Sequence, residues 1–232
     1  VTSIITVSAL AGTGYGANRL AADPVGEKDC PPLFAEYAAP DSSQVNVEIA
    51  PLSAGDMLKW EQKGGTINDV SCLNRTPVYG IVKITSVDDI KNALIFAKEN
   101  KLKISMAGVK HSMGGHAFYK NNLVLDMKGF NQIELNEAEK TITVQSGATW
   151  HDIQNLLHPK YAVKAMQSTD IFTVGGSISV NAHGMDHLAG SVGSSIQSMR
   201  VMLADGSIVN VSRDENPELF NLVVGGYGLF GV

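Results

Sequence analysis

One segment whose residue types and spacing could carry chemistry is Ala107–His116, with the sequence AGVKHSMGGH. Its glycines, Gly108, Gly114 and Gly115, leave backbone N–H groups open to a close approach. A turn of exposed N–H groups binds phosphate without a charged side chain. The alternative is a glycine-rich turn that only connects two elements, and this segment taken alone leaves both readings open.

A second such segment covers residues 167–184, with the sequence QSTDIFTVGGSISVNAHG. The adjacent Gly175 and Gly176 enter a run of Ser and Asn residues, which combines bare backbone with small hydroxyl and amide groups. The segment is not GxGxxG, so a Rossmann dinucleotide site is not indicated. It is not GxxxxGK[ST] either, which excludes a P-loop.

The pair His183 and His187 has the i, i+4 spacing of a helical metal site. Gly184 lies between them, and no Glu occupies the position that HExxH requires. We therefore predict no metal site here. No Ser-His-Asp or Cys-His set can be assembled from the sequence either.

Short strands and capped helices are expected to position these segments. Ser86 with Asp89, and Thr149 with Asp152, are capping pairs that predict a helix after residue 86 and another over about 150–157. The first helix lies between predicted strands, which indicates a β-α-β unit with parallel strands. The strands expected in the chain are 79–85, 102–107, 123–127, 133–135, 141–146, 162–165, 196–203 and 207–212.

Turn and breaker residues complete this outline. Asp205-Gly206 predicts a hairpin between the last two strands, and Asn216-Pro217 predicts the start of a short helix. Five prolines make residues 17–76 read as irregular, with one short helix near 54–62. The small, apolar stretch 173–182 is suited to packing against a flat ligand or a neighbouring backbone.

Composition bounds the class of protein and its partners. With 44% hydrophobic and 18% charged residues, the 232-residue chain can build a buried core. Its net charge of −5 argues against a nucleic-acid partner, which usually meets a basic face.

Cys30 and Cys72 form one disulfide if the protein is exported, or are two unrelated thiols. The apolar residues 1–12 are too short to span a bilayer and are either the end of a signal or anchor, or an ordinary strand or tail. Localisation stays open between cytoplasmic and exported or membrane-associated.

Several segments in order resemble the FAD-binding (PCMH-type) domain of the vanillyl-alcohol oxidase / p-cresol methylhydroxylase flavoprotein superfamily. They are the strand-helix-strand opening, AGVKHSMGG, LVLDM, ITVQSGATW, STDIFTVGGSISVNAHG, MLADGSIV and GGYGLFGV, within residues 77–232. HGMDHLAGSVG is similar to the His-Gly segment of the aldonolactone and alditol oxidases and of decaprenylphosphoryl-ribose oxidase. KHSMGG resembles the His-Ser segment of the lactone, alditol and cytokinin enzymes. The nearest branches are therefore the aldonolactone/alditol oxidases and decaprenylphosphoryl-ribose oxidase. The resemblance implies an α+β fold with an irregular arm (1–76), a small α/β subdomain (77–127) and a larger mixed subdomain (128–232).

The resemblance also implies the site residues. His111 falls where covalent members attach FAD, a bond that needs a neutral imidazole nitrogen, although Lys110 stands where relatives often have Gly. The FAD-binding residues expected in the first segment are Ala107, Gly108, Val109, Lys110, His111, Ser112, Met113 and Gly114. Those expected in the second are Thr169, Asp170, Gly175, Gly176, Ser177, Ser179, Asn181 and Gly184. Val232 is expected to hold the adenine through its backbone.

The implied activity is oxidation of an alcohol carbon of a sugar, polyol or sugar lactone by hydride transfer to FAD, with oxygen or another electron acceptor. Family members continue into a substrate domain that carries the catalytic base, so we assign no catalytic residue and expect this chain alone to be inactive. One alternative is an enolpyruvyl-sugar reductase-like enzyme that uses NADPH. Others are a flavin-binding module without catalysis and a plain structural protein, which would be colourless.

Overall fold

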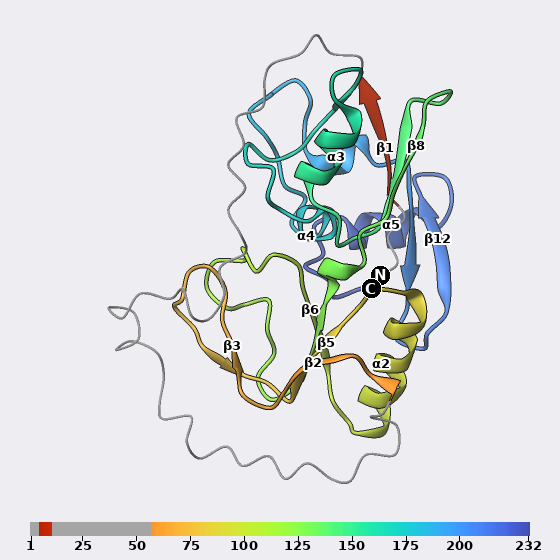
Figure 1. Ribbon diagram of the computed structural model, residues 1–232. Coiled ribbons are helices and arrows are strands. Elements are labelled where there is room, and N and C mark those ends of the chain that lie inside the picture. Colours follow the sequence, from red (N-terminus) through yellow and green to blue (C-terminus); the bar gives the residue numbers. More distant parts are fainter. Residues whose placement is uncertain (1–4, 11–56) are drawn as a thin grey trace. The chain divides into compact units, whose positions relative to one another are not determined.

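The computed structural model describes the backbone of strand β1 (Ile5–Leu10) and residues 57–232, which form a mixture of helices and small sheets (Figure 1). The chain folds into two compact units, and one boundary between them along the sequence falls between Gly129 and Phe130. Of the described residues, 57–129 form what we call the N-terminal unit. Residues 5–10 and 130–232 form the C-terminal unit. The fold is α+β.

The N-terminal unit is built on a four-stranded sheet in the order β2-β5-β7-β6. Strand β7 is parallel to both β5 and β6, whereas β2 pairs antiparallel with β5. The predicted β-α-β unit is therefore present, but β7 lies between its two strands. The elements are β2 (Trp60–Lys63), β3 (Thr66–Ile67), β4 (Thr76–Pro77), β5 (Gly80–Lys83), α2 (Val87–Glu99), β6 (Ile104–Ala107), β7 (Leu123–Asp126) and the short 3-10 turn Met127–Gly129.

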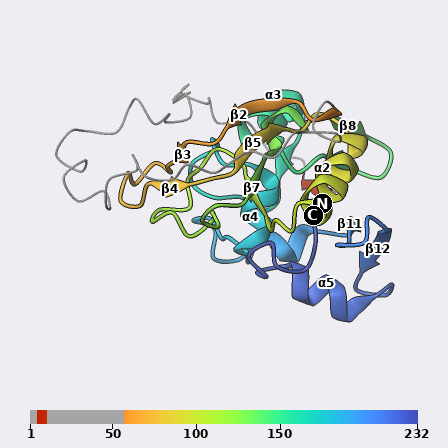
Figure 2. The ribbon, with the colours of Figure 1, turned by 90° about the horizontal axis from the view of Figure 1, so that it is seen from below.

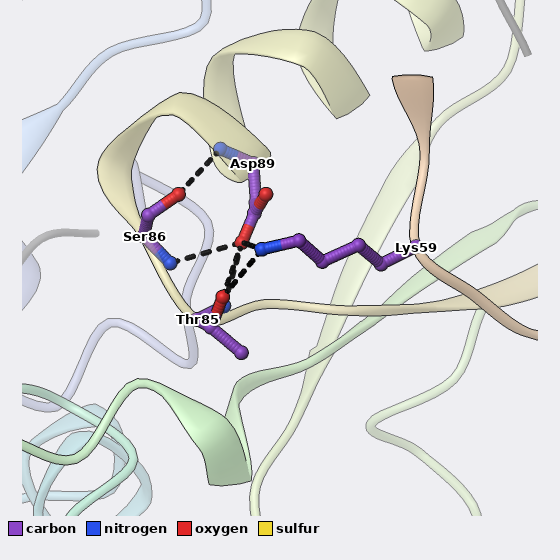
Figure 3. Close-up of polar contacts among 4 residues, drawn as sticks. All are labelled: Lys59, Thr85, Ser86 and Asp89. Carbon is purple, nitrogen blue, oxygen red and sulfur yellow. Dashed lines mark hydrogen bonds and ion pairs between the residues drawn. The ribbon is translucent and has the colours of Figure 1, made fainter. Parts of the chain in front are cut away.

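Helix α2 begins at the predicted capping box. The Ser86 hydroxyl accepts a hydrogen bond from the Asp89 N–H, and the Asp89 carboxylate accepts one from the Ser86 N–H. Figure 3 shows that the same carboxylate oxygen also meets Lys59 and Thr85. Its distance to the Lys59 Nζ atom is 2.8 Å, and the Lys59 Nζ atom also donates to the Thr85 hydroxyl. This polar junction ties the residue before β2 to the start of α2.

The helix expected near residues 54–62 is wrong over its described part, because Trp60–Lys63 is strand β2. The irregular arm expected up to residue 76 likewise contains β3. The Trp60 ring packs edge-on against Phe96 of α2, with 5.5 Å between the ring centroids. This ring contact and the hydrogen-bonded pairing of β2 with β5 override the local sequence pattern that predicted a helix. Tertiary packing commonly decides the conformation where the intrinsic propensity is weak.

The C-terminal unit contains an antiparallel sheet in the order β10-β1-β9-β8. Among the alternatives for the apolar residues 1–12, the structure contains a strand at Ile5–Leu10, which is β1. This strand pairs with both β9 and β10. The other elements of the unit are β8 (Ile133–Asn136), β9 (Thr141–Val144), α3 (Trp150–Leu157), β10 (Ala162–Val163), α4 (Val174–Ser179), the 3-10 turn Val192–Ser195, β11 (Ser198–Met202), β12 (Ile208–Ser212) and α5 (Pro217–Val223).

Strands β11 and β12 form the predicted hairpin, with Met202 opposite Ile208 at its end. The Asp205 carboxylate accepts hydrogen bonds from the Ser207 N–H and hydroxyl, and Gly206 takes a left-handed φ of 86°. Helix α5 lies beside β12 (Figure 2). It begins at Pro217 as predicted, but Asn216 does not cap it through its side chain.

A buried core joins the hairpin, α3 and α4 within this unit. Trp150 is fully buried, and its indole N–H lies 2.9 Å from both the Gln167 side-chain oxygen and the Ser177 hydroxyl. The Thr149–Asp152 capping box predicted for α3 is present. These contacts hold α4, through Ser177, and the segment before it, through Gln167, against the start of α3.

Cys72 is buried and disulfide-bonded, whereas Cys30, the other cysteine of the sequence, lies outside the described residues. Across the described residues, the structure contains no helix with the length and apolar character needed to span a membrane.

Candidate functional site

The loop 108–115, which we call the glycine loop, follows the carboxyl end of β6 in the parallel part of the N-terminal sheet. Ligands of open α/β sheets bind outside the carboxyl ends of parallel strands. The glycine loop, the first segment singled out in the sequence, therefore lies at the end of the sheet where such ligands bind.

Two residues of the glycine loop that are not glycine have left-handed backbone conformations. Lys110 has a φ of 60° and Met113 a φ of 54°, both in the left-handed region. Alternation of right- and left-handed residues turns successive N–H groups toward one point. Within residues 57–129, the N–H groups of Val109, Lys110, Ser112 and Met113 donate no hydrogen bond. The loop therefore offers four open donors.

The glycine loop rests on residues 69–74, which the sequence had placed in an irregular arm. The Val70 N–H donates to the Lys110 carbonyl (2.9 Å), and the Asn74 side-chain nitrogen donates to the Gly114 carbonyl (2.6 Å). A Cβ on Gly115 would lie 2.8 Å from the Asn74 Cβ, so only glycine fits this approach. The Gly114 and Gly115 N–H groups donate to Asp69, at 2.8 and 2.6 Å, and are not open.

The side chains of the glycine loop differ in exposure. Met113 is 64% exposed, whereas Lys110, His111 and Ser112 are half-buried. The His111 Nδ1 atom lies 3.2 Å from the Val109 carbonyl oxygen. Because a carbonyl only accepts, this contact requires a proton on Nδ1, and in the neutral ring Nε2 then carries the lone pair. Ala107 is buried at the end of β6.

Most polar side chains of the second segment are bonded within the C-terminal unit. The Ser177 hydroxyl, 1% exposed, donates to the Thr173 carbonyl, and the Ser179 hydroxyl donates to the Gly175 carbonyl. The Asn181 side-chain oxygen accepts from the Gly193 N–H at 3.0 Å. These three side chains hold α4 and the turn after it, which reduces their capacity to contact a cofactor.

The two glycines of α4 have different surroundings. A Cβ on Gly175 would lie 2.8 Å from the Ser146 Cβ, so this face packs against a neighbouring backbone. A Cβ on Gly176 would meet only the Thr173 hydroxyl, at 3.2 Å, which leaves an open approach. Gly184 packs against the Met166 carbonyl and lines a small pocket nearby.

The remaining predicted residues are Thr169, Asp170 and Val232. Thr169 is exposed, whereas the Asp170 carboxylate lies 2.8 Å from His151 Nδ1 at the start of α3. The Val232 N–H and carbonyl both pair with Met202, at 2.8 Å. Only the second lone pair of that carbonyl is free for an adenine amino group.

Comparison of the sequence with known protein families identifies the family of this chain. Residues 78–212, more than half of the chain, match the family described as FAD binding domain. The chain belongs to this family. It is thus an FAD-binding domain of the vanillyl-alcohol oxidase / p-cresol methylhydroxylase superfamily, and FAD is its cofactor.

Three similar proteins illustrate the relationship. An uncharacterized oxidoreductase of the fasciation locus of Rhodococcoides fascians is 30% identical over 70% of this chain and 37% of its own length. Cytokinin dehydrogenase 2 of Arabidopsis thaliana is 28% identical over 66% of this chain and 31% of that protein. Decaprenylphosphoryl-beta-D-ribose oxidase of Mycolicibacterium smegmatis is 29% identical over 59% and 30%. The chain spans about a third of the length of these relatives.

The residues present fit a diphosphate-containing cofactor. The glycine loop offers N–H donors, and a Cβ on Gly114 would meet only the His116 ring, at 3.6 Å, so the approach is open. Its nearby carboxylate, Asp69, is buried and already bonded. The two predicted segments belong to different units, so their convergence on one diphosphate stays a prediction.

Sequence reasoning missed Asp69, Val70 and Asn74, which support the glycine loop from about 40 residues away. The cluster of polar turn formers in NDVSCLN was the available signal. A single sequence does not say which loop such a turn contacts.

Proposed function

We propose that this chain is the FAD-binding part of a flavin-dependent oxidoreductase that oxidises an alcohol carbon of a sugar, polyol or sugar lactone. When bound, FAD supplies a ring that accepts hydride. The proposed partners are a small alcohol substrate and oxygen or another electron acceptor. The relatives support an oxidoreductase, one of them being named decaprenylphosphoryl-beta-D-ribose oxidase.

The observation that carries the proposal is the set of open N–H donors in the glycine loop. Four of them, with left-handed backbone at Lys110 and Met113, suit the oxygens of a diphosphate. Backbone donors bind an anion without the entropy cost of fixing a long side chain. We propose that the diphosphate of FAD binds at the glycine loop. In the C-terminal unit, Gly176 and Thr169 are the predicted FAD-binding residues that remain open to a cofactor.

We further propose His111 as the attachment point of a covalent FAD. Its Nδ1 contact with the Val109 carbonyl holds the ring in the neutral tautomer that carries the proton on Nδ1, so the lone pair is on Nε2. A neutral imidazole nitrogen is the nucleophile that such a bond needs.

An absorbance spectrum before and after acid precipitation tests attachment. Yellow colour that stays in the pellet of the wild-type chain, and moves to the supernatant for His111→Ala, is the expected result. His116→Ala is the matched control, because His116 is an exposed histidine of the adjoining turn and should leave the colour in the pellet. Colour released from the wild type refutes the covalent bond but not FAD binding.

The substrate class needs a separate test on the full-length protein. Anaerobic addition of a polyol, an aldose or a sugar lactone should bleach the flavin absorbance. Bleaching by NADPH alone would favour the reductase alternative. A flavin that no alcohol bleaches would favour a flavin-binding module without catalysis.

A further inference from the structure

Asp69 is a buried carboxylate that neither the family match nor the sequence patterns single out. It lies in the turn after β3 and is 1% exposed. Burial of a carboxylate is costly unless hydrogen bonds or a cation compensate. Within the described part of the chain, no Lys, Arg or His forms an ion pair with Asp69. Its charge is therefore balanced by neutral donors.

Those donors come largely from the glycine loop. One oxygen, Oδ2, accepts from the Gly114 N–H at 2.8 Å, the Gly115 N–H at 2.6 Å and the Ser112 hydroxyl at 3.3 Å. The other oxygen, Oδ1, accepts from the N–H and hydroxyl of Ser71. Burial raises the pKa of the Asp69 carboxyl, but the bonds from Ser71, Gly115 and Gly114 outweigh it and hold the pKa below its ordinary value. Asp69 is thus ionised at neutral pH.

These bonds stabilise a backbone that would otherwise be unfavourable. Met113, Gly114 and Gly115 have φ values of 54°, 130° and 74°, three consecutive residues with positive φ. Such conformations persist only where surrounding contacts hold them. Asp69 binds the two glycine N–H groups, which leaves the N–H groups of Val109, Lys110, Ser112 and Met113 for a ligand.

We propose that Asp69 is a positioning residue for FAD: its carboxylate holds Ser112–Gly115 in the conformation that presents the remaining N–H groups to the diphosphate. The inference rests on the proposed placement of the diphosphate at the glycine loop. Preorganisation of this kind lowers the ordering cost that binding would otherwise include.

The test measures FAD affinity in a His111→Ala background, where binding is reversible. Asp69→Asn keeps the side-chain shape but replaces one acceptor oxygen with a donor nitrogen. Leaving buried donors unpaired should weaken FAD binding by about tenfold to a hundredfold in a flavin fluorescence titration. Hydrogen exchange of residues 108–116 in the FAD-free variant should become faster.

Asp89→Asn is the matched control, because Asp89 is another buried carboxylate of the same unit but contacts the start of α2 instead of the glycine loop. It should leave both FAD affinity and exchange of the glycine loop close to the background. Equal loss of affinity in the two variants would overturn positioning and indicate general destabilisation. Unchanged affinity in Asp69→Asn would also overturn it. If the background protein itself binds no FAD, the proposed function fails first, and the two failures are thereby distinguished.

Discussion

The polar junction at the start of α2 predicts how the N-terminal unit responds to pH. The Asp89 carboxylate is 7% exposed and accepts hydrogen bonds from the Lys59 ammonium, the Thr85 N–H and hydroxyl, and the Ser86 N–H (Figure 3). Burial raises the pKa of Asp89, but the bonds from Lys59, Thr85 and Ser86 outweigh it and lower the pKa from 3.8 to about 2. Asp89→Asn removes the charge while keeping the shape.

The pKa sets the size and sign of the effect. A lowering from 3.8 to about 2 corresponds to about 2 kcal/mol of unfolding free energy at neutral pH. The unfolded chain binds more protons in the acid range, so this stabilisation is complete above about pH 5 and is lost as the pH falls toward about 2. The variant should therefore be about 2 kcal/mol less stable than wild type at pH 7, and the gap should narrow on acidification.

Urea unfolding followed by fluorine NMR of fluorotryptophan-labelled protein measures this gap, because Trp60 reports the N-terminal unit and Trp150 the C-terminal unit. Asp88→Asn is the control. The Asp88 side chain is 85% exposed and lies 3.9 Å from Lys91, so its loss should cost less than about 0.5 kcal/mol. A gap for Asp89→Asn that keeps its full size down to about pH 3, or that matches the control, refutes the reasoning.

Two substitutions test the backbone of the site. Lys110→Gly removes a side chain from a residue with a φ of 60°, so thermal unfolding should show that the free energy of unfolding rises by up to about 1 kcal/mol. FAD affinity should be retained. A large loss of affinity would show that the Lys110 ammonium group, and not the backbone, binds the diphosphate. Gly184→Ala would place a Cβ 2.1 Å from the Met166 carbonyl oxygen and should cost about 1–3 kcal/mol. Gly176→Ala, whose Cβ meets only one hydroxyl oxygen, should cost much less, and equal losses would contradict the packing argument.

The sequence predicted elements well where local chemistry specifies them. Both capping boxes, at Ser86 and Thr149, are present, and the helices that follow them were predicted at these positions. The Asp205-Gly206 turn gave the hairpin correctly. In each of these cases the decisive contacts join residues three or fewer apart or follow from turn geometry, which a single sequence reveals.

Prediction failed where distant contacts decide the conformation. Strand β2 forms because Trp60–Lys63 pairs with β5, about 20 residues later, and because Trp60 packs on α2. The support of the glycine loop by Asp69 crosses more than 40 residues. Lys110 adds a related case, because its φ of 60° lies in the left-handed region, yet nothing in the sequence marks this lysine as left-handed.

The second segment shows why polar composition was a poor guide to individual contacts. Ser and Asn were expected to face a cofactor because their groups suit phosphate and ribose, but the same groups compete for nearby backbone. Ser177 and Ser179 bond to carbonyls four residues earlier, and Asn181 bonds to the Gly193 N–H, so their first role is to hold α4. The groups left open are the exposed Thr169 and the bare face of Gly176. Any contact of this segment with FAD should therefore depend on those two positions more than on the hydroxyls whose abundance drew attention to it.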